Sequence, residues 1–158
     1  MDQNAEQVVN LLIQRKWHIS FAESCTGGLA AAALVDVPNA SLVLDVSFVT
    51  YASEAKVRVL GVRQETIDRF TVVSGPVARE MAAGAARVAK AEVGVGITGV
   101  AGPSGGTAET PVGTVCFGFF VKGRERQVTK HFGSIGRQAV RQASVAFVFE
   151  TLREMLER

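Results

Sequence analysis

Apolar residues near the start of the chain recur three and four positions apart, which is the spacing of one face of an amphipathic helix. They are Ala5, Val8, Val9, Leu12 and Ile13. The acidic Asp2 and Glu6 stand where they favour a helix N-terminus. We therefore predict a helix over residues 3–16.

The next segment predicts a strand, a turn and a second helix. WHISFA, residues 17–22, has the composition of a short strand. The turn is AESCTGG, after which LAAAALVDV combines strong helix formers with no breaker before Pro38. A helix should start near Gly27 and end before that proline.

Residues 42–51, LVLDVSFVTY, are rich in β-branched and aromatic side chains and are too continuously apolar for a strand with one wet face. This pattern predicts a central strand that is covered on both sides. We expect Ser53 to cap a short helix that holds Lys56.

The remaining elements alternate in the same way. Ser74 or Gly75, followed by a proline, predicts a helix that runs to about Ala91. VGVGIT then predicts a strand, and TVCFGFFV and RQVTKHF predict a hairpin around Lys122-Gly123. A last helix should start near Arg137, because apolar residues follow it at spacings of four, three and four.

Strands that alternate with helices and end in a hairpin indicate an α/β fold. We predict one domain over residues 1–158, folded as a three-layer α/β/α sandwich with a mixed, mostly parallel sheet.

Charge and composition exclude several classes of protein. Seventeen basic and fifteen acidic residues give a net charge of +2, and the basic residues are scattered, so we predict no nucleic-acid partner. No apolar run approaches about 18 residues, so we predict no membrane span. The acidic, polar start of the chain and two distant cysteines predict a cytoplasmic protein.

The ESCTGG turn joins a strand to a helix and carries two candidate nucleophiles. Backbone N–H groups at the start of a helix lack intrahelical partners and stabilise anions. Ser24 or Cys25 could therefore attack an acyl carbon while N–H groups of Cys25, Thr26 or Gly27 hold the resulting oxyanion. The alternative is that Ser24 or Thr26 only caps the helix.

A nucleophilic serine needs a base, and both histidines, His18 and His131, are expected to be structural. Lys56 follows an apolar strand, where desolvation could lower its pKa enough to make it a neutral base. A solvated helix lysine is the alternative. Cys25 with a histidine base is a further alternative.

Two short motifs resemble sites of other protein classes. Gly94, Gly96 and Gly99 match G-x-G-x-x-G, but they lie inside a predicted strand with no helix after it, so we discard a dinucleotide site. Ser53 and Lys56 have Ser-x-x-Lys spacing without the partner motifs of penicillin-binding enzymes. No cluster has metal-ligand spacing, so we predict neither a metal nor a cofactor.

The glycine-dense loop over residues 97–114 can bring backbone close to a ligand and form a nest of N–H groups around a phosphate. A plain long turn is the alternative.

Several motifs together resemble the CinA C-terminal domain family. They are AESCTGG with its alanine-rich helix, Tyr51 and Lys56, GITGVAGPSGG followed by PVGTV, and Gly136-Arg137 ahead of Val140-Arg141. Their order and spacing cover essentially the whole chain. The resemblance implies a three-layer fold and a serine amidohydrolase that converts nicotinamide mononucleotide to nicotinate mononucleotide and ammonia.

The same resemblance assigns roles to individual residues. Ser24 becomes the nucleophile and Lys56 the base, which leaves capping and solvation as the weaker interpretations. Tyr51 lines the site and assists the lysine, and Thr98 and Arg137 bind the substrate. The chain departs from the family pattern at Ser53, which replaces an asparagine, and at Gly136, which replaces an aspartate.

We expect the substrate phosphate to be held by Arg137 and by backbone N–H groups of the glycine loop. The loop residues are Gly102, Ser104, Gly105, Gly106 and Thr107. The expected partners are thus a small nucleotide and a second copy of the chain, as a homodimer or higher homo-oligomer. The competing hypothesis is a non-catalytic nucleotide- or phosphate-binding module in a competence or DNA-damage response.

Overall fold

The computed structural model describes all residues from 1 to 158 and contains one five-stranded sheet. The strands are β1 (Ile19–Glu23), β2 (Phe48–Val49), β3 (Val93–Gly99), β4 (Thr114–Val121) and β5 (Arg124–His131). Their order across the sheet is β2-β1-β3-β4-β5. β1 runs parallel to both β2 and β3, whereas β4 is antiparallel to β3 and β5. The sheet is therefore mixed.

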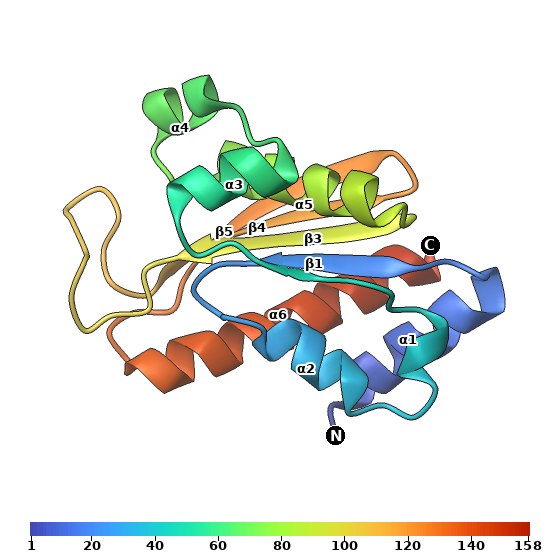
Figure 1. Cartoon of the computed structure of the whole chain (residues 1–158). Helices are drawn as coiled ribbons and strands as arrows, with labels where there is room; N and C mark the ends of the chain where they lie inside the picture. Colours follow the sequence, from blue (N-terminus) through green and yellow to red (C-terminus); the bar gives the residue numbers. More distant parts are fainter.

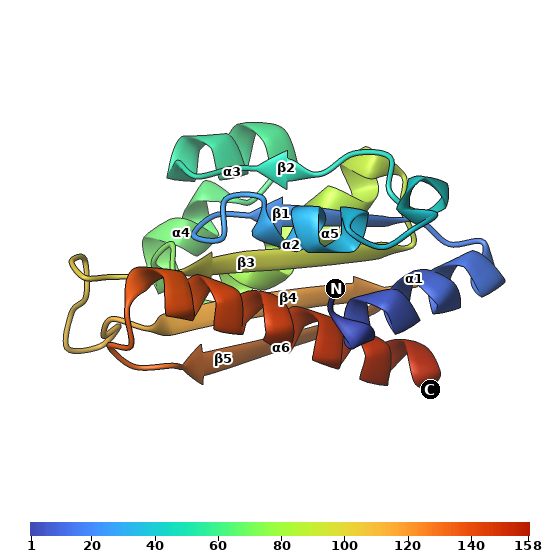
Figure 2. The same cartoon turned by 90° about the horizontal axis from the view of Figure 1, so that it is seen from below.

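Helices cover both faces of this sheet (Figures 1 and 2). They are α1 (Gln3–Arg15), α2 (Leu29–Val35), α3 (Ser53–Leu60), α4 (Gln64–Phe70), α5 (Gly75–Ala89) and α6 (Arg137–Glu157), with a 3-10 turn η1 (Ala40–Leu42). α1, α2 and α6 form one layer, and α3, α4 and α5 form the other. This arrangement confirms the predicted three-layer α/β/α sandwich. None of the helices is both long enough and apolar enough to cross a membrane.

Helix α5 packs against β3 so closely that the strand needs glycines. A Cβ atom at Gly96 would clash with the Ala78 carbonyl oxygen of α5, and one at Gly94 would clash with the Ala82 carbonyl oxygen. The G-x-G-x-x-G match is therefore a product of helix–sheet contact. This agrees with our decision to discard a dinucleotide site there.

The prediction of a central strand over residues 42–51 is wrong, because this segment is the edge of the sheet and only Phe48 and Val49 pair as β2. Next to β2, two serine side chains take the place of backbone–backbone hydrogen bonds between this segment and β1. The Ser20 hydroxyl of β1 donates to the Val46 carbonyl, and the Ser47 hydroxyl accepts from the Phe21 N–H of β1. The apolar composition misleads because several of these side chains are exposed.

Two further predictions for this layer need correction. Ser53 is the first residue of α3 and does not cap it, since Ala52 occupies the N-cap position without a side-chain hydrogen bond. Helix α4 was not predicted. Its seven residues are mostly polar, and only Thr66 is buried, so no apolar stripe marks it in the sequence.

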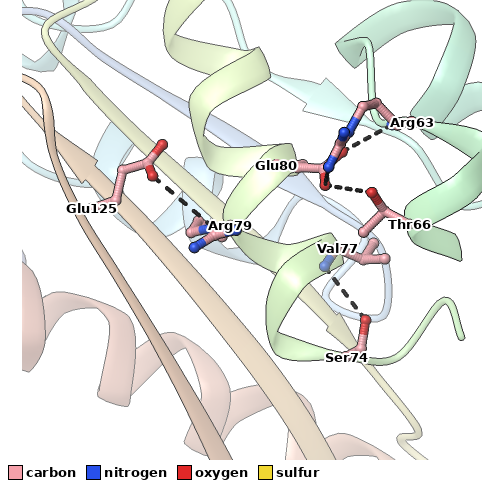
Figure 3. A network of polar contacts seen from close by, with 7 residues as sticks. All are labelled: Arg63, Thr66, Ser74, Val77, Arg79, Glu80 and Glu125. Atoms are coloured by element: carbon pink, nitrogen blue, oxygen red, sulfur yellow. Dashed lines mark hydrogen bonds and ion pairs between the residues drawn. The ribbon is translucent and has the colours of Figure 1, made fainter. Parts of the chain in front are cut away.

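Polar contacts hold α3 and α4 onto α5, as Figure 3 shows for α4. The Glu80 carboxylate of α5 accepts hydrogen bonds from the Arg63 N–H at 2.9 Å and the Thr66 hydroxyl at 2.6 Å. The Ser74 hydroxyl caps α5 by accepting from the Val77 N–H. Arg87 of α5 donates to the Leu60 carbonyl at the end of α3. The helix that carries Lys56 is thus anchored at its C-terminal end.

We predict that Gly96→Ala lowers the free energy of unfolding by about 1–3 kcal/mol, because α5 would have to move away from the sheet to admit a methyl group. Urea denaturation would measure the loss. Gly123→Asn is the matched control, since nothing lies within 4 Å of a side chain there and asparagine tolerates its positive φ. Equal stability of Gly96→Ala and the natural protein would contradict the close-packing argument.

Candidate active site

Ser24 lies directly after β1, at the carboxyl end of the parallel part of the sheet. Its N–H donates to the Ile97 carbonyl of β3 at 3.0 Å, which continues the β1–β3 ladder by one residue and fixes the Ser24 backbone. The side chain is only 8% exposed. Ser24 is therefore held rigidly at the edge where ligands bind in sheets of this kind.

Neither Ser24 nor Thr26 caps the following helix. α2 begins at Leu29 and has Gly28 at its N-cap. The buried Glu23 carboxylate supplies the cap, because its two oxygens accept from the Ala30 and Ala31 N–H groups at 2.9 and 3.0 Å. The capping interpretation of Ser24 is thus replaced by a glutamate that the sequence analysis did not consider.

The Lys56 side chain reaches from α3 to Ser24. Its Nζ lies 3.0 Å from the Ser24 Oγ, 2.7 Å from the Thr50 carbonyl oxygen and 3.2 Å from the Tyr51 carbonyl oxygen. Lys56 is only 1% exposed. The expectation of a buried lysine beside the serine is therefore met, and the solvated-lysine alternative is not.

Burial lowers the pKa of Lys56 from 10.5 to about 8, and the only opposing contribution comes from Cys25. At pH 7.5 about one quarter of such amines are neutral, compared with about one in a thousand for an ordinary lysine. Burial is the only cause that lowers this pKa, and neither the positive end of α2 nor Arg137 contributes to the shift.

The acceptors around Nζ determine where a neutral amine would direct its lone pair. Carbonyl oxygens accept hydrogen bonds and cannot donate them. A neutral amine has two N–H groups, which the Thr50 and Tyr51 carbonyls can accept, so its lone pair is left for the Ser24 hydroxyl. In this arrangement a neutral Lys56 can accept the Ser24 proton, because the other acceptor near that hydroxyl, the Tyr51 carbonyl oxygen, is farther away at 3.5 Å.

Cys25 is poorly suited to be the nucleophile. Burial raises the pKa of its thiol to about 11, so very little thiolate exists near neutrality. The two histidines lie elsewhere: His18 Nδ1 is 2.9 Å from an Asp45 carboxylate oxygen, and His131 Nδ1 is 3.1 Å from the Thr114 hydroxyl. The structure therefore brings no histidine to Cys25.

Two of the three N–H groups expected to hold an oxyanion are free. The N–H groups of Cys25 and Thr26 donate to no protein acceptor. The Gly27 N–H donates to the Ser24 carbonyl at 3.0 Å, so Gly27 is removed from the predicted oxyanion hole. A donor on the residue after the nucleophile, as Cys25 is here, is a common arrangement in acyl-transfer sites.

A pocket of about 170 Å³ opens onto Ser24, Cys25 and Lys56. Its lining consists of Ser24, Cys25, Tyr51, Ser53, Lys56, Val72, Val73, Thr98 and Gly99. The buried Thr98 hydroxyl donates to the Val72 carbonyl at 3.1 Å and so fixes the opposite wall. A larger hollow of about 430 Å³ around Pro38 contains none of the predicted site residues, so we assign the chemistry to the smaller one.

Tyr51 contributes its main chain to the Lys56 site and its side chain to the pocket mouth. The phenol is 60% exposed and accepts a hydrogen bond from Arg137 Nη2 at 3.1 Å. It contacts neither Ser24 nor Lys56, so the structure gives no route for a proton relay through the Tyr51 hydroxyl. The Tyr51 carbonyl, which the sequence analysis did not consider, is the group that touches the amine.

Residues 102–107 of the glycine loop, which we expected to bind the phosphate, do not line the pocket. Arg137 links this loop to the pocket mouth, because its Nη1 donates to the Gly102 carbonyl at 2.8 Å while its Nη2 donates to the Tyr51 hydroxyl. Ser104, Gly105, Gly106 and Thr107 are exposed. The Thr107 N–H donates to the Thr110 carbonyl, so Thr107 is a poor phosphate ligand. The N–H groups of the other four predicted loop residues donate to no protein acceptor.

Arg141 belongs to a motif that carries the family resemblance, but no role was predicted for its side chain. Its Nε donates to the Cys25 carbonyl at 3.0 Å, and its Nη2 donates to the Thr26 carbonyl at 3.1 Å. The sequence spacing indicates that Arg141 lies near the site, since it follows Arg137 by four residues and therefore shares its face of α6.

The family model of the CinA C-terminal domain matches residues 1–156. A putative competence-damage inducible protein of Clostridium perfringens is 44% identical over 153 residues, which cover 97% of this chain and 37% of the relative. A CinA-like protein of Chlorobaculum tepidum is 52% identical over 117 residues, which cover 74% of this chain and 28% of the relative. The chain thus spans well under half the length of these curated relatives.

Solved structures give the same similarity at the level of the whole chain. A competence/damage inducible protein from Agrobacterium tumefaciens superposes with a TM-score of 0.95 at 39% identity, over 99% of this chain and 95% of that one. A CinA superfamily protein from Klebsiella pneumoniae superposes with a TM-score of 0.93 at 36% identity, over 99% and 97%.

The lowered pKa of Lys56 makes stability depend on pH. Above about pH 8 the folded chain has released this proton, whereas the unfolded chain keeps it up to about pH 10.5. The unfolded state then binds more protons, so stability rises with pH in this window. We predict that the free energy of unfolding, measured relative to Lys56→Met in urea, rises between about pH 8 and 10.5 and is flat below about pH 7.

Lys90→Met is the control, because it removes an exposed lysine whose side chain makes no ion pair or hydrogen bond, and it should not reproduce the rise between about pH 8 and 10.5. A Lys56→Met difference that does not change between pH 7 and 10 would mean that Lys56 titrates as an ordinary lysine.

Proposed function

Because the chain belongs to the CinA C-terminal domain family and holds a serine against a buried lysine, we propose that it is a serine amidohydrolase that converts nicotinamide mononucleotide and water to nicotinate mononucleotide and ammonia. The observation that carries the proposal is the 3.0 Å contact between Lys56 Nζ and Ser24 Oγ, with two main-chain carbonyl oxygens as the other hydrogen-bond partners of the amine. This geometry supports a lysine that activates a serine.

In the first step neutral Lys56 accepts the hydroxyl proton of Ser24 while Oγ attacks the carboxamide carbon. The electron pair of the carbonyl double bond moves to oxygen, and the N–H groups of Cys25 and Thr26 bind the oxyanion. The Lys56 ammonium then donates a proton to the amide nitrogen as the C–N bond breaks. Ammonia leaves, and an ester on Ser24 remains.

Hydrolysis of the ester reverses these roles. Neutral Lys56 takes a proton from water, and the resulting hydroxide attacks the ester carbon to form a second oxyanion in the same hole. As this intermediate collapses, the Ser24 oxygen leaves and recovers a proton from Lys56. The product acid ionises to nicotinate, and no metal or redox partner is needed at any step.

The size of the pocket supports binding of only one end of the substrate. Its volume of about 170 Å³ is smaller than the roughly 300–1,000 Å³ of sites that enclose a whole ligand. The pyridine ring and carboxamide would enter it between Val72 and Tyr51, while the ribose and phosphate remain outside. Arg137 keeps free guanidinium donors at the mouth, and free N–H groups of the glycine loop lie beyond it.

We predict that Ser24→Ala abolishes ammonia release from nicotinamide mononucleotide, because no other group on the turn can replace the attacking oxygen. A coupled ammonia assay would measure it. Cys25→Ala should keep a readily measured rate, since alanine retains the backbone N–H, and Cys116→Ala is the matched control for loss of a buried thiol. Turnover by Ser24→Ala but not by Cys25→Ala would transfer the nucleophile to the thiol.

Absence of ammonia release from the natural protein, together with binding of the nucleotide, would instead favour a non-catalytic nucleotide-binding module. The names of the relatives, which refer to competence and damage, are compatible with that second candidate.

We predict that kcat/KM rises with pH along a limb near pH 8, the pKa expected for Lys56. Lys56→Arg preserves the charge but supplies no neutral base near neutrality, so it should be nearly as inactive as Lys56→Ala. Rate measurements from pH 6 to 10 would test both points. If Lys56→Arg retained most of kcat, the lysine would act only through its charge, and another base would be required.

A further inference from the structure

We propose that Arg141 is a positioning residue that sets the oxyanion hole by clamping the two peptide units that follow Ser24. The inference rests on the proposed serine amidohydrolase and assigns a role to a side chain that does not line the pocket. Arg141 acts from behind the turn, on carbonyl groups, and touches neither the substrate nor Lys56.

The geometry of a trans peptide links each carbonyl that Arg141 binds to the N–H group that follows it. In a planar trans unit the C=O and the following N–H point in opposite directions. Arg141 Nε binds the Cys25 carbonyl at 3.0 Å, and the N–H of the same unit belongs to Thr26. Fixing the carbonyl toward the guanidinium therefore aims the unpaired Thr26 N–H away from it, on the other side of the turn.

The second contact fixes the next unit. Arg141 Nη2 binds the Thr26 carbonyl at 3.1 Å, and the N–H of that unit, on Gly27, closes the turn by donating to the Ser24 carbonyl. Two bonds from one planar guanidinium therefore hold two consecutive peptide planes. Arginine suits this task because its donors have a fixed fork geometry.

Two backbone hydrogen bonds also hold the turn, from the Gly27 N–H to the Ser24 carbonyl and from the Leu29 N–H to the Thr26 carbonyl, but Arg141 is the one donor to the Cys25 carbonyl. Gly27 and Gly28 have φ values of 55° and 106°, and glycine loses more conformational freedom on folding than any other residue. The Thr26 hydroxyl is buried and makes no hydrogen bond. A Cβ at Gly27 would lie 3.4 Å from Arg141 Nη2, so the guanidinium also packs directly against this flexible residue.

The guanidinium charge adds to its positioning effect. Hydrogen bonds in which one partner is ionised are about twice as strong as neutral ones. A cation bound to the carbonyl end of a peptide polarises that peptide and makes its N–H a better donor to a developing negative charge. The Arg141 charge should therefore lower the free energy of the transition state more than that of the bound substrate.

The steady-state test compares Arg141→Gln and Arg141→Lys with Arg124→Gln. Arg124 also donates to a backbone carbonyl of α6, that of Met155 at 3.3 Å, and lies outside the site, so it controls for loss of an arginine–carbonyl bond. We expect kcat to fall about 100-fold in Arg141→Gln, as for loss of one oxyanion-hole donor. KM and the limb near pH 8 should stay unchanged. Arg141→Lys should recover only part of kcat, and it keeps the test usable if the glutamine variant does not fold.

A second measurement uses pyridine-3-boronic acid, which forms a tetrahedral anion on a nucleophilic serine. Its affinity should fall in Arg141→Gln by the same factor as kcat, whereas the affinity for nicotinate mononucleotide should not change. Equal losses for the boronate and the product would indicate a merely structural role and overturn the proposal. Unchanged kcat and boronate affinity would overturn it while leaving the amidohydrolase intact.

The boronate also separates this inference from the choice of substrate. If the natural protein released no ammonia from nicotinamide mononucleotide but bound the boronate through Ser24, only the substrate would be wrong, and the Arg141 comparison would still decide the inference. If it showed no Ser24-dependent boronate binding, both proposals would fall.

Discussion

The structure around the candidate site depends on burying one amine. Lys56 is enclosed almost completely, and its Nζ is surrounded by two main-chain carbonyls and the Ser24 hydroxyl. The Thr50 carbonyl is fixed because the N–H of the same residue donates to the Glu23 carbonyl and extends the β1–β2 pairing. Ser24 is fixed in the same way by β3. Hydrogen bonds to the sheet therefore fix the positions of Thr50 and Ser24, and α3 places the Lys56 amine beside them.

Burial of the amine costs stability at neutral pH, since desolvation disfavours the charged form that the unfolded chain adopts. Contacts of α5, in the same helical layer as α3, offset the free-energy cost of burying the amine. α5 packs on the sheet through glycines, and its Glu80 and Arg87 side chains hold the ends of α3 and α4. A loosely held α3 would let Lys56 turn into solvent, where it would regain its ordinary pKa and be protonated near neutrality.

The sequence predicts the elements with strong periodicity or caps, such as α1, α5, α6 and the β4–β5 hairpin. It fails over residues 42–51 because composition does not distinguish a central strand from an edge whose apolar side chains are partly exposed. The side chains of the site, Ser24, Lys56, Tyr51 and Thr98, were found from motifs. The contacts made by main-chain groups, such as the Tyr51 carbonyl, carry no residue signature and required the fold.

The same desolvation acts in opposite ways on the two neighbouring candidates for chemistry. Burial favours the neutral form of any ionisable group, so it lowers the pKa of Lys56 to about 8 and raises that of Cys25 to about 11. A neutral lysine is a base, but a neutral thiol is a weak nucleophile. A serine hydroxyl needs no charge before it reacts, provided that a base takes its proton during attack. One apolar environment therefore favours a neutral amine at Lys56 beside the Ser24 hydroxyl and disfavours a thiolate at Cys25.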